Sequence, residues 1–360
     1  MSGELVKATP VGRGLVLREG LVPDIIMAAG KKAERRWVEF FTAELTNDNT
    51  RAAYALALNE FFDWLGEVDG LGDGNEDLLA ISTHHVSAYR EWLVKSPSLV
   101  KGRKGAMVEK TRSVPTVKLK LAAIRSLFRY LHAGSVIEMD PAASVRAPKH
   151  SVTIGKTAVL EGTEAAKILD TLTAGIEAKP DDVIALRDRA LIGLMTYTLA
   201  RVSAAVGMKV GDVRMIGNRR HVELHEKGGK HHVMPCHHEL EDYLVAYMTG
   251  AGTADKPDTP LFRAFDNKTR KIGGQALTRM KAWEMVQRRA KAAGVTTDAC
   301  NHTFRATGIT TFLANGGAIE KARDMAAHAS IRTTQLYDRR NKAVKMDDVV
   351  LINLRKVTPA

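Results

Sequence analysis

The segment AHASIRTTQLYDRR, residues 327–340, places a tyrosine nine residues after a histidine and among three arginines. A phenol oxygen is a poor nucleophile near neutral pH, because the pKa of tyrosine is about 10. Tyr337 could do covalent chemistry only if groups from elsewhere in the chain activate it. A lone tyrosine near a helix end is more often a packing residue.

Candidates for the activating groups occur in three other segments. TLARVSAAVGMKVGDV contains Arg201, and NHTFRATGITTFL contains His302 and Arg305 in an H-x-x-R arrangement. The turn KGGK offers Lys227 and, three residues later, its rival Lys230. Arginine and lysine supply positive charge, and histidine exchanges a proton near neutral pH. Each fragment alone is weak, since single residues of these types are usually structural.

Helices and one hairpin must position these groups. RDRALIGLMTYTLA predicts a buried helix that runs into Arg201, and further helices are expected from about 276 to 292 and 303 to 314. RHVELHEKGGKHHVMPCH alternates, with Val222 and Leu224 on one side and polar residues on the other. It therefore predicts a β-hairpin with KGGK at its turn.

Amphipathic helices also dominate the first part of the chain. NTRAAYALALNEFFDWL predicts a helix capped by Asn49, and STHHVSAYREWLV predicts one that starts at Ser82 or Thr83. In TVKLKLAAIRSLFRYL, apolar residues recur at helical spacing on one stripe. We therefore expect a small all-helical domain before a larger, mostly helical domain that contains the hairpin.

Two helices carry basic residues that could face DNA. Residues 101–129 hold nine Lys or Arg and a single acid, and part of this charge forms a ridge on the helix that follows KGRKG. Phosphate contacts explain this ridge better than a solvated face does. For the later helix TRMKAWEMVQRRAKAAG, a solvated face is an equal alternative. The candidate DNA-contacting residues are Lys118, Arg125, Arg129, Arg279, Lys281 and Arg288.

The composition agrees with a nucleic-acid partner. The chain of 360 residues has 53 Lys or Arg against 41 Asp or Glu, a net charge of +12, which favours a polyanion. No apolar run approaches the ~18 residues of a membrane span. Two cysteines, Cys236 and Cys300, are too few for a disulfide framework. We expect a cytoplasmic protein that associates with the nucleoid when bound to DNA and has no membrane partner.

A metal site in the hairpin is a competing interpretation. Histidines four apart on one strand lie ~13 Å from each other, too far to share an ion. The spacing also fits no standard zinc finger. We therefore expect no metal ion and assign these side chains to hydrogen bonding or basic contacts. The residues concerned are His221, His225, His231, His232, Cys236, His237 and His238.

Taken together, these fragments resemble the tyrosine recombinases, the lambda-integrase or Xer-like family. His328 follows Arg305 by 23 residues, Tyr337 follows His328 by nine, and TTQLY is close to the family ending TTxxY. TRAAY and TVKLKLAAIRSLFRYL…DPA are similar to the family's core-binding domain. The resemblance covers roughly residues 35–340, and the combined motif is specific.

The resemblance implies a mainly α fold with a small antiparallel β-sheet. A helical, SAM-like core-binding domain would precede the tyrosine-recombinase catalytic domain, which has the DNA breaking-rejoining fold. The expected parts are a loosely ordered arm at 1–30, the core-binding domain at 31–147, a linker at 148–157, the catalytic domain at 158–340 and a tail at 341–360. Met346, Val350 and Leu354 of the tail would dock on a neighbouring protomer or fold back.

The resemblance also implies the chemistry. The tyrosine would attack a DNA phosphodiester and form a 3′-phosphotyrosyl link that preserves bond energy, so no cofactor or metal is required. Arginines and histidines would stabilise charge on the phosphate oxygens, and the turn lysine would protonate the departing 5′ oxygen. This cationic pocket would activate the tyrosine. The predicted catalytic residues are Arg201, Lys227, His302, Arg305, His328 and Tyr337.

The resulting hypothesis is a site-specific integrase that acts on double-stranded DNA at a core site. Four protomers would exchange strands through a Holliday junction, with accessory DNA-bending or directionality factors as further partners. The alternatives are Xer-like resolution of multimers, relaxation by a type IB topoisomerase, and a non-catalytic DNA-binding regulator.

Three positions depart from the family pattern. Ala204 stands where the family often has an acid, Ala306 where it often has histidine, and Ala327 where it usually has glycine. Loss of the acid would leave Arg201 or His302 less firmly held.

Overall fold

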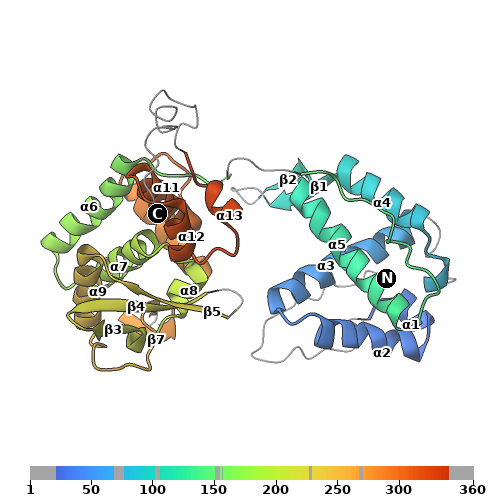
Figure 1. Ribbon diagram of the computed structural model, residues 1–360, viewed down its shortest axis with the longest axis horizontal. Helices are drawn as coiled ribbons and strands as arrows, with labels where there is room; N and C mark the ends of the chain where they lie inside the picture. Colours follow the sequence, from blue (N-terminus) through green and yellow to red (C-terminus); the bar gives the residue numbers. More distant parts are fainter. Residues whose placement is uncertain are drawn as a thin grey trace, which may run out of the picture. The chain divides into compact units, whose positions relative to one another are not determined.

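The computed structural model describes residues 22–68, 77–101, 106–150, 155, 157–226, 229–266 and 271–339. The chain divides into two compact units, Met1–Ser151 and Val152–Ala360. Both are mainly helical with small antiparallel sheets (Figure 1), which confirms the predicted fold class. Among the described residues, no helix is long and apolar enough to cross a membrane.

The first unit consists of helices and one hairpin. Its elements are α1 (Asp24–Ala28), α2 (Lys31–Glu39) with a π-helical turn (Phe40–Glu44), α3 (Asp48–Val68), a 3-10 turn (Leu78–Ala80), α4 (Thr83–Lys95), β1 (Pro97–Lys101), β2 (Met107–Thr111) and α5 (Val114–Ala133). Strands β1 and β2 pair antiparallel, so the all-helical prediction is wrong. Every residue of β2 is exposed, and its sequence MVEKT shows no alternation of apolar and polar residues, which is the mark of a half-buried strand.

The predicted helices of this unit are present, and their apolar stripes form its core. On α5, the predicted apolar residues Val117, Leu121, Ile124, Phe128 and Leu131 are each at most 2% exposed. This packing, rather than intrinsic propensity, supplies most of the stability of such helices.

Two local predictions at the start of this unit need correction. The side chain of Asn47, not Asn49, accepts hydrogen bonds from the first turn of α3, at 3.1 Å from Asn49 N and 3.2 Å from Thr50 N. Helix α1 lies inside the arm that was expected to be loosely ordered, and its Ile25 and Ile26 are buried in the core. Ser82 begins α4 as predicted.

The second unit combines helices with a three-stranded and a two-stranded sheet. Its elements are α6 (Gly162–Ala178), α7 (Val183–Tyr197), α8 (Val202–Gly207), a 3-10 turn (Val210–Asp212), β3 (Val213–Ile216), β4 (Arg219–Glu226), β5 (Lys230–Pro235), α9 (His238–Gly250), β6 (Arg263–Asp266), β7 (Lys271–Ala276), α10 (Arg279–Ala292), α11 (Asn301–Ala314), α12 (Ile319–Met325) and α13 (Ile331–Gln335).

The predicted hairpin is confirmed as β4 and β5. Val222 pairs with Met234, and both Val222 and Leu224 are fully buried. Strand β3 extends this sheet, and β6 and β7 form a separate antiparallel pair. The sequence reading did not anticipate these three strands, which are only four to six residues long.

Close packing of α11 against α7 sets the geometry around Arg201. A Cβ atom added to Gly308 on α11 would lie 2.3 Å from the carbonyl oxygen of Thr196 near the end of α7. Only glycine permits this approach without a shift of the backbone. After α7, Leu199 adopts a positive φ of 56°, and the chain turns into α8. The H-x-x-R helix thereby lies beside the turn that precedes Arg201.

Candidate active site

Four separate segments of the second unit bring the predicted residues together. Arg201 is the N-cap of α8, His302 and Arg305 lie on α11, His328 follows α12, and Tyr337 follows α13. Figure 1 shows α11, α12 and α13 grouped together, with α8 beside the end of β4 and the start of β5. Lys227 lies outside the described residues, between the end of β4 and the start of β5.

Tyr337 is buried but not in purely apolar surroundings. It is 8% exposed and packs in a small apolar cluster that includes Leu199 and Ala306. Its hydroxyl group lies 2.7 Å from Nε2 of His302, at hydrogen-bonding distance. Its ring stacks on that of His328, with centroids 5.9 Å apart and planes 12° from parallel. The tyrosine is thus held between the two predicted histidines.

The pKa shifts of this pair assign a direction to proton transfer. Burial lowers the pKa of His302, and Arg305 and Arg201 lower it further, so the imidazole is neutral at neutral pH. A neutral ring with an unprotonated Nε2 can accept the proton of the phenol. Burial raises the pKa of Tyr337, and the two arginines offset this only in part. The expected cationic pocket therefore does not by itself make the phenol acidic.

The two arginines occupy different environments. The side chain of Arg305 is completely buried, and it donates Nη1 to the carbonyl of Leu199 and Nη2 to that of Ala326. Its Nε has no hydrogen-bond partner among the described residues. Burial, and then Arg201, lowers the pKa of Arg305 to about 10, so it stays charged at neutral pH. The Arg201 side chain is 30% exposed and could reach a ligand from solvent.

Glu226, at the end of β4, joins these arginines and was missed by the sequence reading. Its side chain is 1% exposed. It accepts a hydrogen bond from Arg201 N at 3.2 Å, pairs with Arg201 Nη1 at 2.5 Å, and lies 3.8 Å from Arg305 Nη1. Alternation from Val222 and Leu224 puts position 226 on the buried face of the strand. A charged residue at a buried strand position was the signal that could have revealed it.

His232 is a second neighbour of this site, and it was expected only to make hydrogen bonds or basic contacts around the hairpin. Both nitrogens of its ring are buried, and the backbone of Met325 is a hydrogen-bonding neighbour. Burial lowers its pKa, and the Glu226 carboxylate acts in the opposite direction. His232 is therefore a neutral polar group beside the carboxylate that binds both arginines.

The hairpin also contains a cluster of possible metal ligands. The ligand atoms of Glu223, His225 and His231 all lie within 4.8 Å of one another. Histidines four apart on one strand are too distant to share an ion, but His225 and His231 pair across the hairpin and so lie close together. The carboxylate of Glu223 already binds Arg214 and His231. These ion pairs account for the cluster, and a metal ion would have to displace them.

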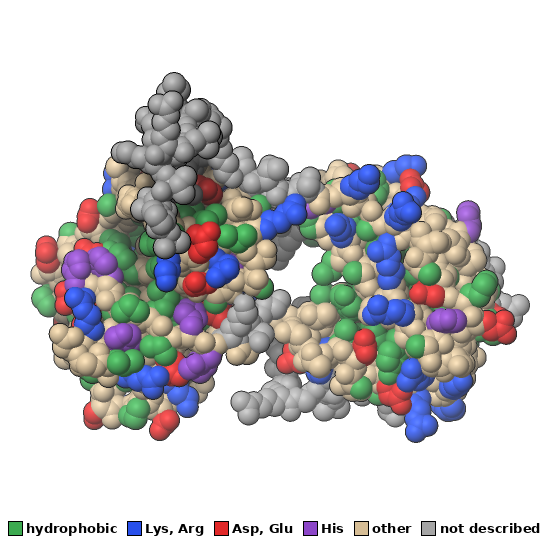
Figure 2. Space-filling view, viewed as in Figure 1, with side chains coloured by type: hydrophobic (Ala, Val, Ile, Leu, Met, Phe, Trp, Pro, Cys, Tyr) green, Lys and Arg blue, Asp and Glu red, His purple; other side chains and the backbone are tan. Residues whose placement is uncertain are grey.

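The basic residues assigned to DNA contacts fall into two groups. Figure 2 shows Lys and Arg side chains over much of the visible face of the first unit. Arg125 donates to the carbonyl of Val145, and Arg288 pairs with the buried Asp188 at 2.9 Å. These two arginines have structural partners. Lys281 also has an ion-pair partner, Glu284, at 2.7 Å. The candidates whose residues are exposed are Lys118, Arg129, Arg279, Lys281 and Arg288.

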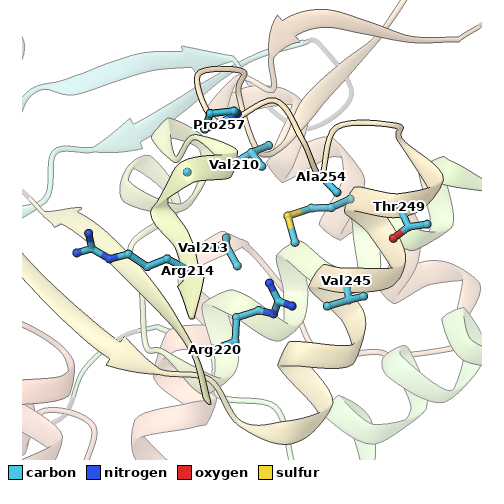
Figure 3. A pocket seen from close by; sticks show the side chains of 10 residues that line it. Val210, Val213, Arg214, Arg220, Val245, Thr249, Ala254 and Pro257 are labelled. Atoms are coloured by element: carbon cyan, nitrogen blue, oxygen red, sulfur yellow. The ribbon is translucent and has the colours of Figure 1, made fainter. Parts of the chain in front are cut away.

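A pocket of about 330 Å³ lies elsewhere in the second unit (Figure 3). It is lined mainly by apolar residues such as Val210, Val213 and Met248. Arg220 points into it, whereas Arg214 extends away. None of its lining residues belongs to the cluster around Tyr337.

Comparison with known proteins decides the family. Residues 158–343 match the sequence profile of the phage integrase family. The chain belongs to this family. The tyrosine recombinase XerD of Mycobacterium leprae (strain TN) is 31% identical over 264 residues, which cover 73% of this chain and 79% of the relative. The predicted family resemblance and the enzyme class, a tyrosine recombinase, are thus confirmed.

Solved structures of tyrosine recombinases share the fold of this phage integrase family member. The XerH site-specific recombinase in a post-cleavage complex with palindromic difH substrate gives a TM-score of 0.66 at 16% identity, covering 93% of this chain and 98% of that chain. A lambda integrase tetramer bound to a Holliday junction gives 0.58 at 16% identity, covering 87% and 79%.

Proposed function

We propose that this protein is a site-specific DNA recombinase that uses Tyr337 as its nucleophile. The observation that carries this proposal is the 2.7 Å contact between His302 Nε2 and the Tyr337 hydroxyl, beside two arginines. The phenol oxygen would form a bond to phosphorus while its proton passes to His302. Arg201 and Arg305 would stabilise the negative charge that develops on the non-bridging oxygens.

The remaining predicted residues complete the step. The bond from phosphorus to the 5′ oxygen would break, and Lys227 would donate a proton to that oxygen. His328, which stacks on Tyr337 and contacts Thr334 through Nδ1 at 2.9 Å, would donate a hydrogen bond to the phosphate. The 3′-phosphotyrosyl link retains the energy of the phosphodiester, so a second 5′ hydroxyl could reverse the reaction on another strand.

Strand exchange would take place in a tetramer at a Holliday junction. The first unit would be the core-binding domain. The tail beyond residue 340, which lies outside the described residues, would contact a neighbouring protomer. The lambda integrase tetramer that shares this fold supports the assembly.

The sequence resemblance first suggested the integrase of a mobile element. The relatives named tyrosine recombinase XerD favour the Xer-like alternative. Recombination between two copies of one site would support the Xer-like role, and a need for two dissimilar sites would support integration.

A trapping experiment tests the covalent step. A library of random-sequence duplexes, each nicked so that the cleaved end diffuses away, is incubated with wild-type protein, and adducts that resist detergent are recovered and sequenced. We expect adducts with wild type and none with Tyr337→Phe. Adducts with Tyr337→Phe would exclude the nucleophile, and their absence with wild type would favour a non-catalytic regulator. Relaxation of supercoiled plasmid that lacks the selected sequence would favour a topoisomerase.

A further inference from the structure

Helix α8 begins without a capping hydrogen bond from its own side chains. Arg201 is the N-cap residue, and among the described residues of the helix no side chain makes a capping hydrogen bond. An acid at the third helical position can accept the backbone N–H of the N-cap residue. That position is Ala204, which is 6% exposed and has no polar side chain. The position where the family often has an acid is therefore the capping position of this helix.

Glu226 makes the contact that Ala204 cannot make. Its Oε1 accepts the Arg201 backbone N–H at 3.2 Å, and its Oε2 pairs with Arg201 Nη1 at 2.5 Å. The acceptor comes from strand β4 instead of the first turn of α8. The same carboxylate lies 3.8 Å from Arg305 Nη1 and so reaches the second arginine as well.

We propose that Glu226 is a positioning residue that replaces the missing acid at Ala204 and fixes both arginines for phosphate binding. This inference rests on the proposed function. Two guanidinium groups close together repel each other, and a buried carboxylate between them offsets that repulsion. One negative charge against two positive charges leaves a net positive site. Glu226 also immediately precedes Lys227, so it fixes the strand end from which the turn with the predicted general acid starts.

Four variants test this role on the nicked duplex that wild type selects in the trapping experiment. They are Glu226→Gln, Ala204→Glu, the double variant of the two, and Glu223→Gln as a matched control from the other face of β4. The rate of adduct formation is measured with protein in excess, and affinity for the intact duplex is measured by fluorescence anisotropy at fixed salt. The melting temperature of each variant is recorded.

We expect Glu226→Gln to form adduct more slowly while it keeps its affinity for the intact duplex. Glu226→Gln should slow adduct formation about 100-fold, the size of effect that a small misplacement of catalytic groups produces. Its affinity for the duplex should change by less than about threefold, because many other phosphate contacts contribute to binding. Ala204→Glu should restore most of the rate in the Glu226→Gln background. Glu223→Gln should cleave at the wild-type rate.

The outcomes separate this inference from the proposed function. Failure of wild type to form adduct would refute the function itself. Adduct from wild type together with a wild-type rate for Glu226→Gln would overturn only the positioning role. A slow double variant would overturn the replacement of Ala204. If Glu226→Gln does not fold, the double variant is expected to fold and cleave, and an unfolded double variant would equally overturn the inference.

Discussion

Two buried carboxylates of the second unit bind arginines, and they differ in what remains unsatisfied. Asp188 on α7 is completely buried, and each of its oxygens accepts two hydrogen bonds at 2.7–3.0 Å, from Arg187, Arg288 and Arg289. The side chain of Glu226 is 1% exposed, and exposure of the partners does not separate the two sites, since Arg201 is 30% and Arg288 is 56% exposed. The other arginine beside Glu226, Arg305, keeps an Nε without a partner among the described residues.

The difference distinguishes a structural cluster from a site that can take a ligand. Around Asp188 both carboxylate oxygens are saturated, and the three arginines join α7 to α10. Beside Glu226, the buried Nε of Arg305 has no partner among the described residues, and a buried unpaired donor costs free energy until a ligand satisfies it. Counting basic residues in the sequence treats both sets alike, which explains why Arg288 was placed among the DNA contacts.

The largest expected effect comes from breaking the saturated cluster. Asp188→Asn leaves three arginines near one neutral amide, and loss of one partner of a buried ion pair costs about 3–5 kcal/mol. Glu226→Gln should lower stability less, because Arg201 can turn to solvent and Arg305 retains two carbonyl acceptors. Calorimetric melting of both full-length variants measures this order.

The rate of adduct formation tests whether Asp188→Asn affects only stability. At temperatures where Asp188→Asn remains folded, its adduct rate should match wild type, whereas Glu226→Gln should be slow. If Asp188→Asn is slow while still folded, the two clusters do not divide into structural and functional as argued.

An intermediate effect is expected at Ala327, next to the carbonyl that binds Arg305. Ala327 has a φ of 46°, where an L-residue with a side chain is strained and glycine is not. Ala327→Gly should therefore raise the free energy of unfolding by about 0.5–1 kcal/mol. Ala166→Gly, at an exposed position in the second turn of α6, should lower it by about 1 kcal/mol. Equal losses in both variants, measured by calorimetry, would refute the explanation from backbone conformation.

The smallest expected effect is a change in how stability depends on pH, caused by His302, which lies near the two arginines that Glu226 binds. The pKa of His302 lies below 6.5 in the folded chain, chiefly because the ring is buried. The unfolded chain binds a proton there at higher pH, so stability falls as pH drops below about 6.5 and levels off below the folded pKa. His302→Gln should reduce the difference in melting temperature between about pH 7.5 and about pH 5.5. An unchanged slope would mean that folding does not lower the pKa of His302, and the argument that burial keeps this imidazole neutral would fail.

Features that depend on local periodicity were the predictable part of the fold. The apolar stripe of α5 and the alternation in β4 correctly identified the buried residues, because helix and strand have fixed repeats of 3.6 and 2 residues. The exposed strand β2 lacks such a repeat and was missed. The cap of α3 was misplaced by two residues, since Asn47 and Asn49 are equally good caps by residue type.

For the site, the kinds of reacting groups and the spacings within one element could be predicted from local sequence, such as His302 and Arg305 one turn apart on α11. Which of these groups share a partner depends on how the elements pack together. Glu226 binds Arg201 across 25 positions of the chain, and His302 meets Tyr337 across 35. Such contacts follow from the packing of whole elements, which sums many weak interactions, and no short segment contains that information.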